Sequence, residues 1–148
     1  MNTQELWDIL ENNAITRLNF AGVYPKDLIK ISDSLPYFII CNTDTSKNEG
    51  LHWICFYHDE NNIMEYFDSL GKKMEYYGNA FKQLFYNSGA TTLKQSSVQL
   101  QSSNSKLCGE YCLYFLYSKC MGNTMNNIVH NFPCENTLQY TVRYLYKM

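Results

Sequence analysis

The stretch LHWICFYHDENNIMEYFDSLG, residues 51–71, decides the fold that this sequence predicts. It holds two short apolar runs, residues 51–58 and residues 62–67, which are separated by the polar residues 59–61. Runs of this length on either side of a short polar turn are typical of an antiparallel hairpin. Another apolar run, at residues 37–41, predicts a buried strand upstream of the hairpin.

The register of the hairpin follows if His58 pairs with Asn62 across the turn, because antiparallel partners then sum to 120. This register places apolar residues opposite each other along both strands. It also places His52 directly opposite Asp68 at the open end of the hairpin. Directly opposed residues have Cβ atoms about 4.5–5.5 Å apart, which lets an imidazole reach a carboxylate. A shift of one residue would remove this pairing.

Helices and one further strand are expected around the hairpin. A first helix is indicated by Thr3 as its cap and by an apolar face of Leu6, Trp7, Leu10 and Ala14. A second helix is indicated by the helical spacing of Met74, Tyr77, Phe81, Leu84 and Phe85 before Gly89. Further along the chain we expect a short strand at residues 97–101, a buried helix at residues 107–121 before Gly122, and a last helix from Asn136 with Leu138, Val142 and Leu145. This order predicts an α+β fold in which helices flank a central mixed β-sheet. With 148 residues, we expect a single domain that spans residues 1–148.

The composition excludes several classes of protein. Apolar residues make up 45% of the chain and aromatic residues 16%, too many for a disordered or collagen-like chain. The formal charge is −2, from 12 basic and 14 acidic residues, and the longest basic run is Lys72-Lys73, so there is no strong signal for nucleic-acid binding. No apolar run reaches about 18 residues and the N-terminus lacks a signal peptide. We therefore expect an intracellular protein without a membrane segment.

Six cysteines are present, and we expect them to be reduced thiols. Without a secretory signal, and with a core large enough to be stable alone, disulfides are not needed. The sequence contains neither a Cys-x-x-Cys pair nor a Cys/His quartet, so we expect no metal site.

Cys108 stands where the buried helix is expected to begin, and Gly109 follows it. A thiol at a helix N-terminus beside an imidazolium has a lowered pKa and becomes a thiolate nucleophile. His52, oriented by Asp68, would supply that imidazolium. The backbone N–H of Cys108 and the side-chain amide of Gln101, seven residues earlier, would donate to an oxyanion. Each residue alone more often has a structural role, but together they are typical of a cysteine protease.

Several sequence blocks resemble the adenovirus-type cysteine proteases, the adenain family, which belongs to the wider clan of SUMO-cleaving proteases. The blocks are Gly50-Leu51-His52-Trp53, Tyr66-Phe67-Asp68-Ser69-Leu70-Gly71, the stretch from Gln101 to Cys112, Phe20-Ala21-Gly22-Val23-Tyr24 and Asn42-Thr43. The likeness covers residues 4–121. The seven-residue spacing from Gln101 to Cys108, and Leu107 before the cysteine, are similar to the adenovirus branch rather than the SUMO-protease branch.

The resemblance implies a cysteine-protease fold with the catalytic cysteine at the N-terminus of a buried helix. It makes Cys108 the nucleophile and His52 the general base and acid. It makes Asp68 the residue that orients His52, and Gln101 the oxyanion donor.

For the substrate, the resemblance implies that Trp53 walls a narrow channel and that Gly22 and Tyr24 line the cleft. Family members process viral capsid and core proteins at sites with Gly at or near the scissile bond. Side chains larger than Gly would clash with the walls of a tight channel. The expected function is therefore a viral endopeptidase of virion maturation. We expect it to act as a monomer on protein precursors, in the host-cell interior and in the virion.

Three features depart from the family pattern. Adenovirus enzymes commonly have Glu where Asp68 stands, and they are basic and use DNA as a cofactor, whereas this chain is acidic overall. They also join an activating peptide by a disulfide to a Cys before the Gln, and residues 88–99 contain no Cys. The sequence therefore requires no cofactor, and activation by DNA or by a peptide stays an open alternative.

Two other functions would use the same residues. A deconjugase that removes a ubiquitin-like modifier from host proteins would share the site and add a surface for the folded modifier. A binding protein of the same fold without activity is the third reading. Loss of activity would be expected to remove at least one of the four residues His52, Asp68, Gln101 and Cys108, and all are present.

Overall fold

The computed structural model describes all 148 residues and has an α+β architecture. The elements in chain order are α1 (Thr3–Glu11), β1 (Phe20–Pro25), β2 (Tyr37–Asn42), β3 (Trp53–His58), β4 (Ile63–Phe67), the 3₁₀ helix η1 (Met74–Tyr77), α2 (Ala80–Ser88), β5 (Thr92–Gln95), α3 (Cys108–Cys120), α4 (Met125–His130) and α5 (Glu135–Tyr146). The predicted fold class is confirmed. Strand β1 and helix α4 are additional elements that the sequence pattern did not indicate.

The five strands form one sheet in the order β1-β2-β3-β4-β5. β1 is parallel to β2 and β4 is parallel to β5, whereas β3 is antiparallel to both of its neighbours. Four strands therefore end at one end of the sheet, and β3 begins there. We call this end, marked by Pro25, Asn42, Trp53, Phe67 and Gln95, the carboxyl end of the sheet.

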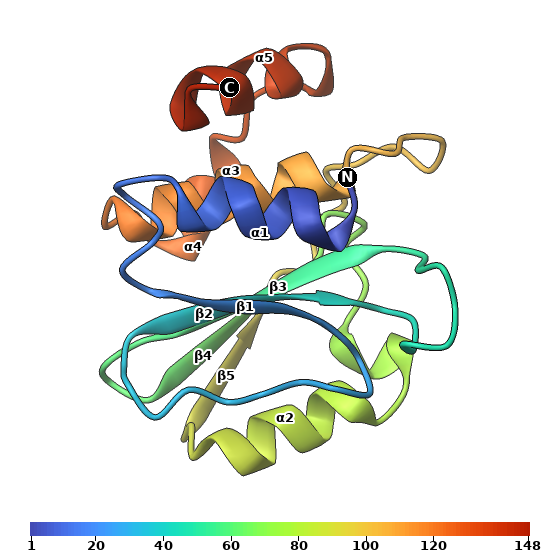
Figure 1. Cartoon of the computed structure of the whole chain (residues 1–148), viewed down its shortest axis with the longest axis vertical. Helices are drawn as coiled ribbons and strands as arrows, with labels where there is room; N and C mark the ends of the chain where they lie inside the picture. Colours follow the sequence, from blue (N-terminus) through green and yellow to red (C-terminus); the bar gives the residue numbers. More distant parts are fainter.

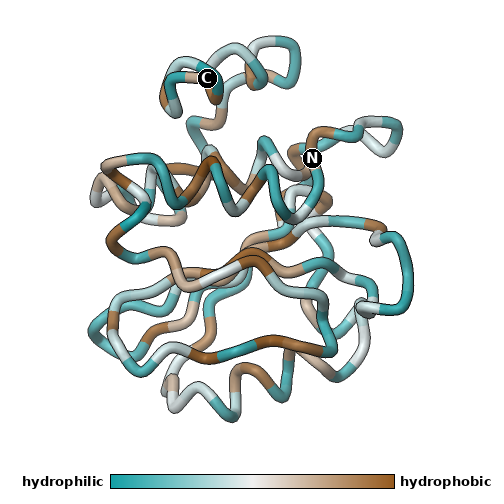
Figure 2. Tube along the Cα trace, in the orientation of Figure 1, coloured by the Kyte–Doolittle hydropathy of each residue, from teal (hydrophilic) through white to brown (hydrophobic).

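Helices cover both faces of the sheet: α1, α3, α4 and α5 lie on one side and α2 lies on the other (Figure 1). Along β2, Phe38 and Ile40 belong to the core under α3, while Ile39 and Cys41 belong to the core over α2. Because both faces are covered, β2 and β3 are buried along their whole length and form continuous apolar runs. By contrast, the loop between β2 and β3 is mostly hydrophilic, as its colour in Figure 2 shows.

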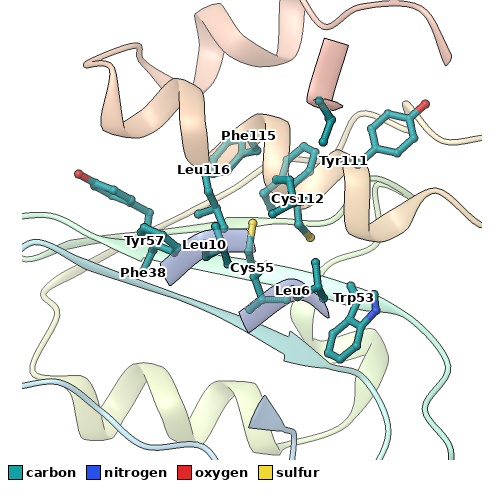
Figure 3. Packing of buried hydrophobic residues seen from close by; sticks show 14 of the residues in the cluster. Leu6, Leu10, Phe38, Trp53, Cys55, Tyr57, Tyr111, Cys112, Phe115 and Leu116 are labelled. Carbon is teal, nitrogen blue, oxygen red and sulfur yellow. The ribbon is translucent and has the colours of Figure 1, made fainter. Parts of the chain in front are cut away.

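Helix α3 is the centre of the larger core. Its residues Tyr111, Cys112 and Phe115 are at most 1% exposed, and Cys112 points toward Cys55, which lies on β3 beneath the helix (Figure 3). Burial of this face holds α3 against the sheet, since each large apolar side chain contributes about 1.5–3 kcal/mol. The helix is thereby fixed with its first residue, Cys108, near the carboxyl end of the sheet.

The register of the hairpin differs from the prediction by two residues. The strands pair His58 with Met64 rather than with Asn62, so antiparallel partners sum to 122. The reason is a longer turn, in which the Asp59 carboxylate accepts a hydrogen bond from the N–H of Ile63 at 3.0 Å and Asn62 has a φ of +62°. A shift of two residues keeps every side chain on its predicted face, because side chains alternate with a period of two.

The helix predicted from Met74 onward is interrupted. Gly78, with a φ of +103°, ends η1, and α2 begins only at Ala80. At the other end Gly89, with a φ of +80°, terminates α2 as predicted.

The strand predicted at residues 97–101 is wrong, because the strand of the sheet lies just upstream, in β5. Residues 97–101 leave the sheet, and the backbone N–H groups of Leu100 and Gln101 both donate to the carbonyl of Ser69. The apolar spacing of this segment therefore reflects packing beside a turn.

The first helix is capped by Asn2 rather than by Thr3, since the Asn2 side chain accepts a hydrogen bond from the N–H of Glu5 at 2.8 Å. Ala14 lies beyond the end of this helix and is exposed. Leu6 and Leu10 are fully buried, as their spacing predicts. None of the helices combines the length and the hydrophobicity that crossing a membrane requires.

Candidate active site

His52 and Asp68 lie side by side at the carboxyl end of the sheet. His52 directly precedes β3, and Asp68 directly follows β4. His52 Nε2 is 2.6 Å from Asp68 Oδ1; Asp68 is fully buried and His52 is 8% exposed. The carbonyl of His52 also accepts a hydrogen bond from the N–H of Thr43 at 2.9 Å, which fixes its backbone beside β2. The two side chains are therefore in contact, although neither residue belongs to the ladder of the hairpin.

The Asp68 carboxylate has four hydrogen-bond donors. Oδ1 accepts from His52 and from the N–H of Leu70 at 3.0 Å. Oδ2 accepts from the hydroxyl of Tyr77 at 2.5 Å and from the N–H of Lys72 at 3.3 Å. A buried carboxylate is tolerated only when such donors satisfy it. The four donors hold the carboxylate in one orientation, with Oδ1 toward the imidazole.

Tyr77 is a residue that sequence reasoning missed. Besides donating to Asp68, its ring lies 6.0 Å from the ring of His52, with an angle of 33° between the two planes. Burial and the hydrogen bond to Asp68 both raise the pKa of Tyr77, so the phenol remains a donor. The sequence assigned Tyr77 to the apolar face of a helix. No spacing rule links it to His52, because the contact depends on the way η1 folds back under the sheet.

Cys108 is the first residue of α3, and it lines the same cleft as His52, close enough for each side chain to shift the pKa of the other. Because Asp68 holds His52 Nε2, the other ring nitrogen, Nδ1, is the one left free for the thiol.

The pKa values of His52 and Cys108 are shifted in opposite directions. Burial lowers the pKa of His52, but hydrogen bonds with Asp68 and Cys108 outweigh it and raise that pKa to about 9. Burial raises the pKa of the Cys108 thiol, but hydrogen bonds with His52 and with the backbone of Trp53 and Gly109 outweigh it, so that pKa is lowered. Both shifts favour a thiolate–imidazolium pair over the neutral pair.

Gln101 is 3% exposed and lies beside the same cleft as His52 and Cys108. Its Oε1 accepts a hydrogen bond from the Ser69 hydroxyl at 2.6 Å, and its Nε2 donates to the carbonyl of Ser105 at 2.8 Å. An amide NH₂ has two hydrogens, so one remains for a ligand. The backbone N–H of Cys108 is a second free donor, because the first N–H groups of a helix have no partner within it. An oxyanion between these two donors can be stabilised.

A cleft of about 700 Å³ opens at the carboxyl end of the sheet. Its walls come from residues 1–3, from the loop between β2 and β3, and from the segment that precedes α3. His52, Trp53, Gln101 and Cys108 all line it. The volume is in the range of ligand sites, about 300–1,000 Å³.

Trp53 is fixed at the cleft by the N-terminal residue. The indole Nε1 donates a hydrogen bond to the carbonyl of Met1 at 2.9 Å. The Met1 side chain lies over Gly109, where an added Cβ would meet it at 3.4 Å. The sequence carries no signal for this contact, which joins residues more than fifty positions apart.

Gly22 and Tyr24 do not line this cleft. They lie on the edge strand β1, and Tyr24 borders a separate hollow of about 300 Å³ together with Phe20 and Tyr37. Gly22 has a φ of +142°, and a Cβ at this position would overlap the Tyr24 ring. The Tyr24 hydroxyl donates to the carbonyl of Ala21 at 2.8 Å. The two residues thus contact each other, and the glycine is explained by its backbone and by the space that the tyrosine occupies.

The arrangement places a thiol, an imidazole held by a carboxylate and two free N–H donors around one cleft. These are the parts that acyl transfer requires. All six cysteines are free thiols, and no group of three or more His, Cys, Asp or Glu side chains is placed to hold a metal ion.

Comparison with known proteins agrees with this geometry. The family model of the adenovirus endoprotease matches residues 20–139 of the chain. The protease of Bovine adenovirus B serotype 3 is 28% identical in an alignment that covers 78% of this chain and 70% of that protease. The crystal structure of a selenomethionine form of an ASFV protease is similar in fold, with a TM-score of 0.51 and 20% identity over 76% of this chain. This chain spans 44% of that protease, less than half of its length.

The region that matches the family model extends over most of the chain and contains His52, Asp68, Gln101 and Cys108. The resemblance read from the sequence blocks is thereby confirmed, and the fold is one that cysteine proteases adopt. The chain belongs to the adenovirus endoprotease family of cysteine proteases.

Proposed function

We propose that this chain is a viral cysteine endopeptidase that cleaves capsid or core precursor proteins at Gly-containing sites during virion maturation. The observation that carries the proposal is that His52, hydrogen-bonded to Asp68, lines one cleft together with Cys108. Membership of the adenovirus endoprotease family supports the viral context. Proteolysis of precursors would take place in the host-cell interior and in the virion.

In the proposed reaction the Cys108 thiolate attacks the carbonyl carbon of the scissile peptide bond. The imidazolium of His52, held by Asp68, protonates the leaving amine, and the acyl group remains on sulfur as a thioester. His52 then removes a proton from water, which attacks the thioester and releases the acid product. Gln101 Nε2 and the N–H of Cys108 stabilise the oxyanion of both tetrahedral intermediates.

The preference for Gly is supported by the way Trp53 is held. The indole is 7% exposed, lines the cleft and is tied to the carbonyl of Met1. A wall that cannot move discriminates against larger side chains by steric clash. We infer that Trp53 and the Met1 side chain form the part of the cleft that admits only small residues beside the scissile bond.

We infer further that a single chain is active without DNA or a peptide activator. In the chain alone His52 is already hydrogen-bonded to Asp68 and lines one cleft with Cys108, so no partner is needed to bring the three residues together. The net charge of −2 is unfavourable for DNA, and residues 88–99 have no Cys to anchor a peptide. Added duplex DNA should leave kcat/KM unchanged, and a stimulation that falls with salt would contradict this inference.

The test is cleavage by the purified chain under reducing conditions, scored by mass spectrometry. The substrates are a mixed peptide library and a panel of folded ubiquitin-like fusions. Cleavage of short peptides at Gly-containing sites is expected, with none by Cys108→Ala and full activity in Cys134→Ala, which removes an exposed thiol. If only the folded fusions are cleaved, the chain is a deconjugase rather than an endopeptidase of precursors. If neither substrate is cleaved, the proposal of a protease that needs no activator is contradicted.

A further inference from the structure

We propose that Ser69 is a positioning residue that orients the amide of Gln101 for oxyanion binding. This role rests on the proposed function, because it assumes that Gln101 Nε2 donates to the oxyanion. Ser69 is fully buried, directly follows Asp68 and does not line the cleft. It therefore acts on Gln101 from behind, without touching the substrate.

The hydrogen bonds of the amide permit only one of its two orientations. Ser69 Oγ donates to Gln101 Oε1 at 2.6 Å, while Gln101 Nε2 donates to the carbonyl of Ser105 at 2.8 Å. Turning the amide over would place Oε1 against the Ser105 carbonyl, where two acceptors would face each other. Ser105 lines the cleft and Ser69 does not, so the fixed orientation turns the NH₂ group toward the cleft.

The backbone of Ser69 holds the same residue. Its carbonyl accepts hydrogen bonds from the N–H of Leu100 at 2.8 Å and from the N–H of Gln101 at 2.9 Å. Gly71, with a φ of +74°, lets the turn approach this segment, since a Cβ there would lie 2.8 Å from the backbone nitrogen of Gln99. Side chain and main chain of Gln101 are thus both located by the turn that follows β4.

One four-residue turn, Asp68-Ser69-Leu70-Gly71, therefore serves both halves of the site. Asp68 orients the imidazole of His52, and the next residue orients the amide of Gln101. Adjacent positions on a single tight turn keep the base and the oxyanion donor at a constant distance from each other. Preorganisation of this kind is what makes oxyanion donors effective.

The test compares Ser69→Ala with the matched variant Ser96→Ala. Ser96 is also buried, at 6% exposed, but its hydroxyl has no hydrogen-bond partner. Ser69→Ala is expected to lower kcat on the order of tenfold, less than the roughly 10²–10³-fold typical of losing an oxyanion donor outright. KM should stay unchanged, and Ser96→Ala should retain the wild-type kcat.

A second readout separates this role from general damage to the site. Iodoacetamide alkylation of Cys108 needs the thiolate but no oxyanion donor, so its rate should be unchanged in Ser69→Ala. Site-resolved mass spectrometry is required, because Cys134 is also exposed. A parallel fall in the alkylation rate and in kcat would overturn the proposal. If Ser69→Ala does not fold, Ser69→Cys takes its place, since the thiol is a weaker donor of similar size.

A double-mutant cycle with Gln101→Ala completes the test. If Ser69 acts through Gln101, Ser69→Ala should cause no further loss of kcat once Gln101 is alanine. An equal loss in both backgrounds would overturn the positioning role. If Gln101→Ala keeps full activity while Cys108→Ala has none, the oxyanion assignment in the proposed function is wrong, and the role of Ser69 falls with it.

Discussion

Cys108 and Cys112 lie one turn apart on α3, yet their thiols have opposite properties. Cys108 shares the cleft with His52, whose influence lowers the pKa of the thiol against the effect of burial. Cys112 is fully buried against Cys55, and burial raises its pKa far above the ordinary value. In Figure 3 Cys112 points into the core toward Cys55. Burial opposes ionisation at both positions, so the difference arises from the partner, an imidazole in one case and a second thiol in the other.

The first residue of α3 and the turn that follows it therefore have different tasks. The second turn, with Tyr111 and Cys112, contributes packing that fixes the helix on β3. The first residue, Cys108, is at the free end of the helix, where the dipole and unpaired N–H groups favour an anion. Packing of the second turn therefore fixes the position of the Cys108 thiol at the end of the helix.

The largest effect on activity is expected from replacing Cys108 by alanine, and the same replacement at Cys112 is the comparison. Cys108→Ala should lower kcat/KM on the order of 10⁵–10⁶-fold, because members of a catalytic triad act as a unit. Cys112→Ala should keep most of the activity but lower the free energy of unfolding by about 1 kcal/mol, through the cavity it leaves. Peptide cleavage and urea unfolding measure the two effects. Loss of activity in a fully folded Cys112→Ala would show that the two turns do not have separate tasks.

Asp68→Asn should remove most of the difference between the pKa values of the Cys108 and Cys112 thiols. Without the carboxylate, the pKa of His52 falls from about 9 toward its ordinary value, and the pKa of Cys108 rises. The thiolate–imidazolium pair exists only at pH values above the pKa of the thiol and below the pKa of the imidazole. Because the variant brings these two pKa values closer together, the bell-shaped pH profile of kcat/KM should narrow from both sides. We expect kcat to fall on the order of 10³–10⁴-fold.

The control for this variant is Glu110→Gln, which changes a buried carboxylate on α3 that does not touch His52. Its pH profile should keep the wild-type width. A profile of unchanged width in Asp68→Asn would mean that Asp68 does not set the pKa of His52.

Tyr77→Phe should have the smallest effect of the three. It removes the hydroxyl that donates to Asp68 Oδ2 but keeps the ring beside His52. A hydrogen bond to a charged group contributes about 1.5–3 kcal/mol, and with three donors left on Asp68 we expect kcat to fall on the order of tenfold. Tyr76→Phe is the matched control, because Tyr76 is 69% exposed. Equal kcat values for the two variants would remove Tyr77 from the support of the triad.

The sequence could predict the features that depend on local pattern. His52 and Asp68 were placed on one face by a register that is wrong by two residues, and the contact survives because a shift of two preserves the face. Cys108 was placed at a helix start by the long apolar run that follows it and by Gly122 at its end. These inferences need only periodicity and turn chemistry.

The remaining parts of the site depend on tertiary contacts that no pattern encodes. Three such contacts come from different elements: Tyr77 lies on η1, Ser69 lies in the turn after β4, and Met1 is the first residue of the sequence. Gly22 and Tyr24 belong to a block that resembles the family, but resemblance along a strand does not tell which residues face the cleft. The left-handed φ of Gly22 and its contact with Tyr24 explain the pair by conformation.

The measurement that tests the central claim most directly is capture of the acyl-enzyme. The chain is mixed with a Gly-containing peptide substrate, quenched with acid within the first turnover and mapped by mass spectrometry. We predict a thioester on Cys108, carrying the N-terminal part of the substrate, that decays as product forms and is absent from the peptide that carries Cys134. Turnover without an adduct on Cys108, or an adduct on another cysteine, would contradict the assignment of Cys108 as the nucleophile.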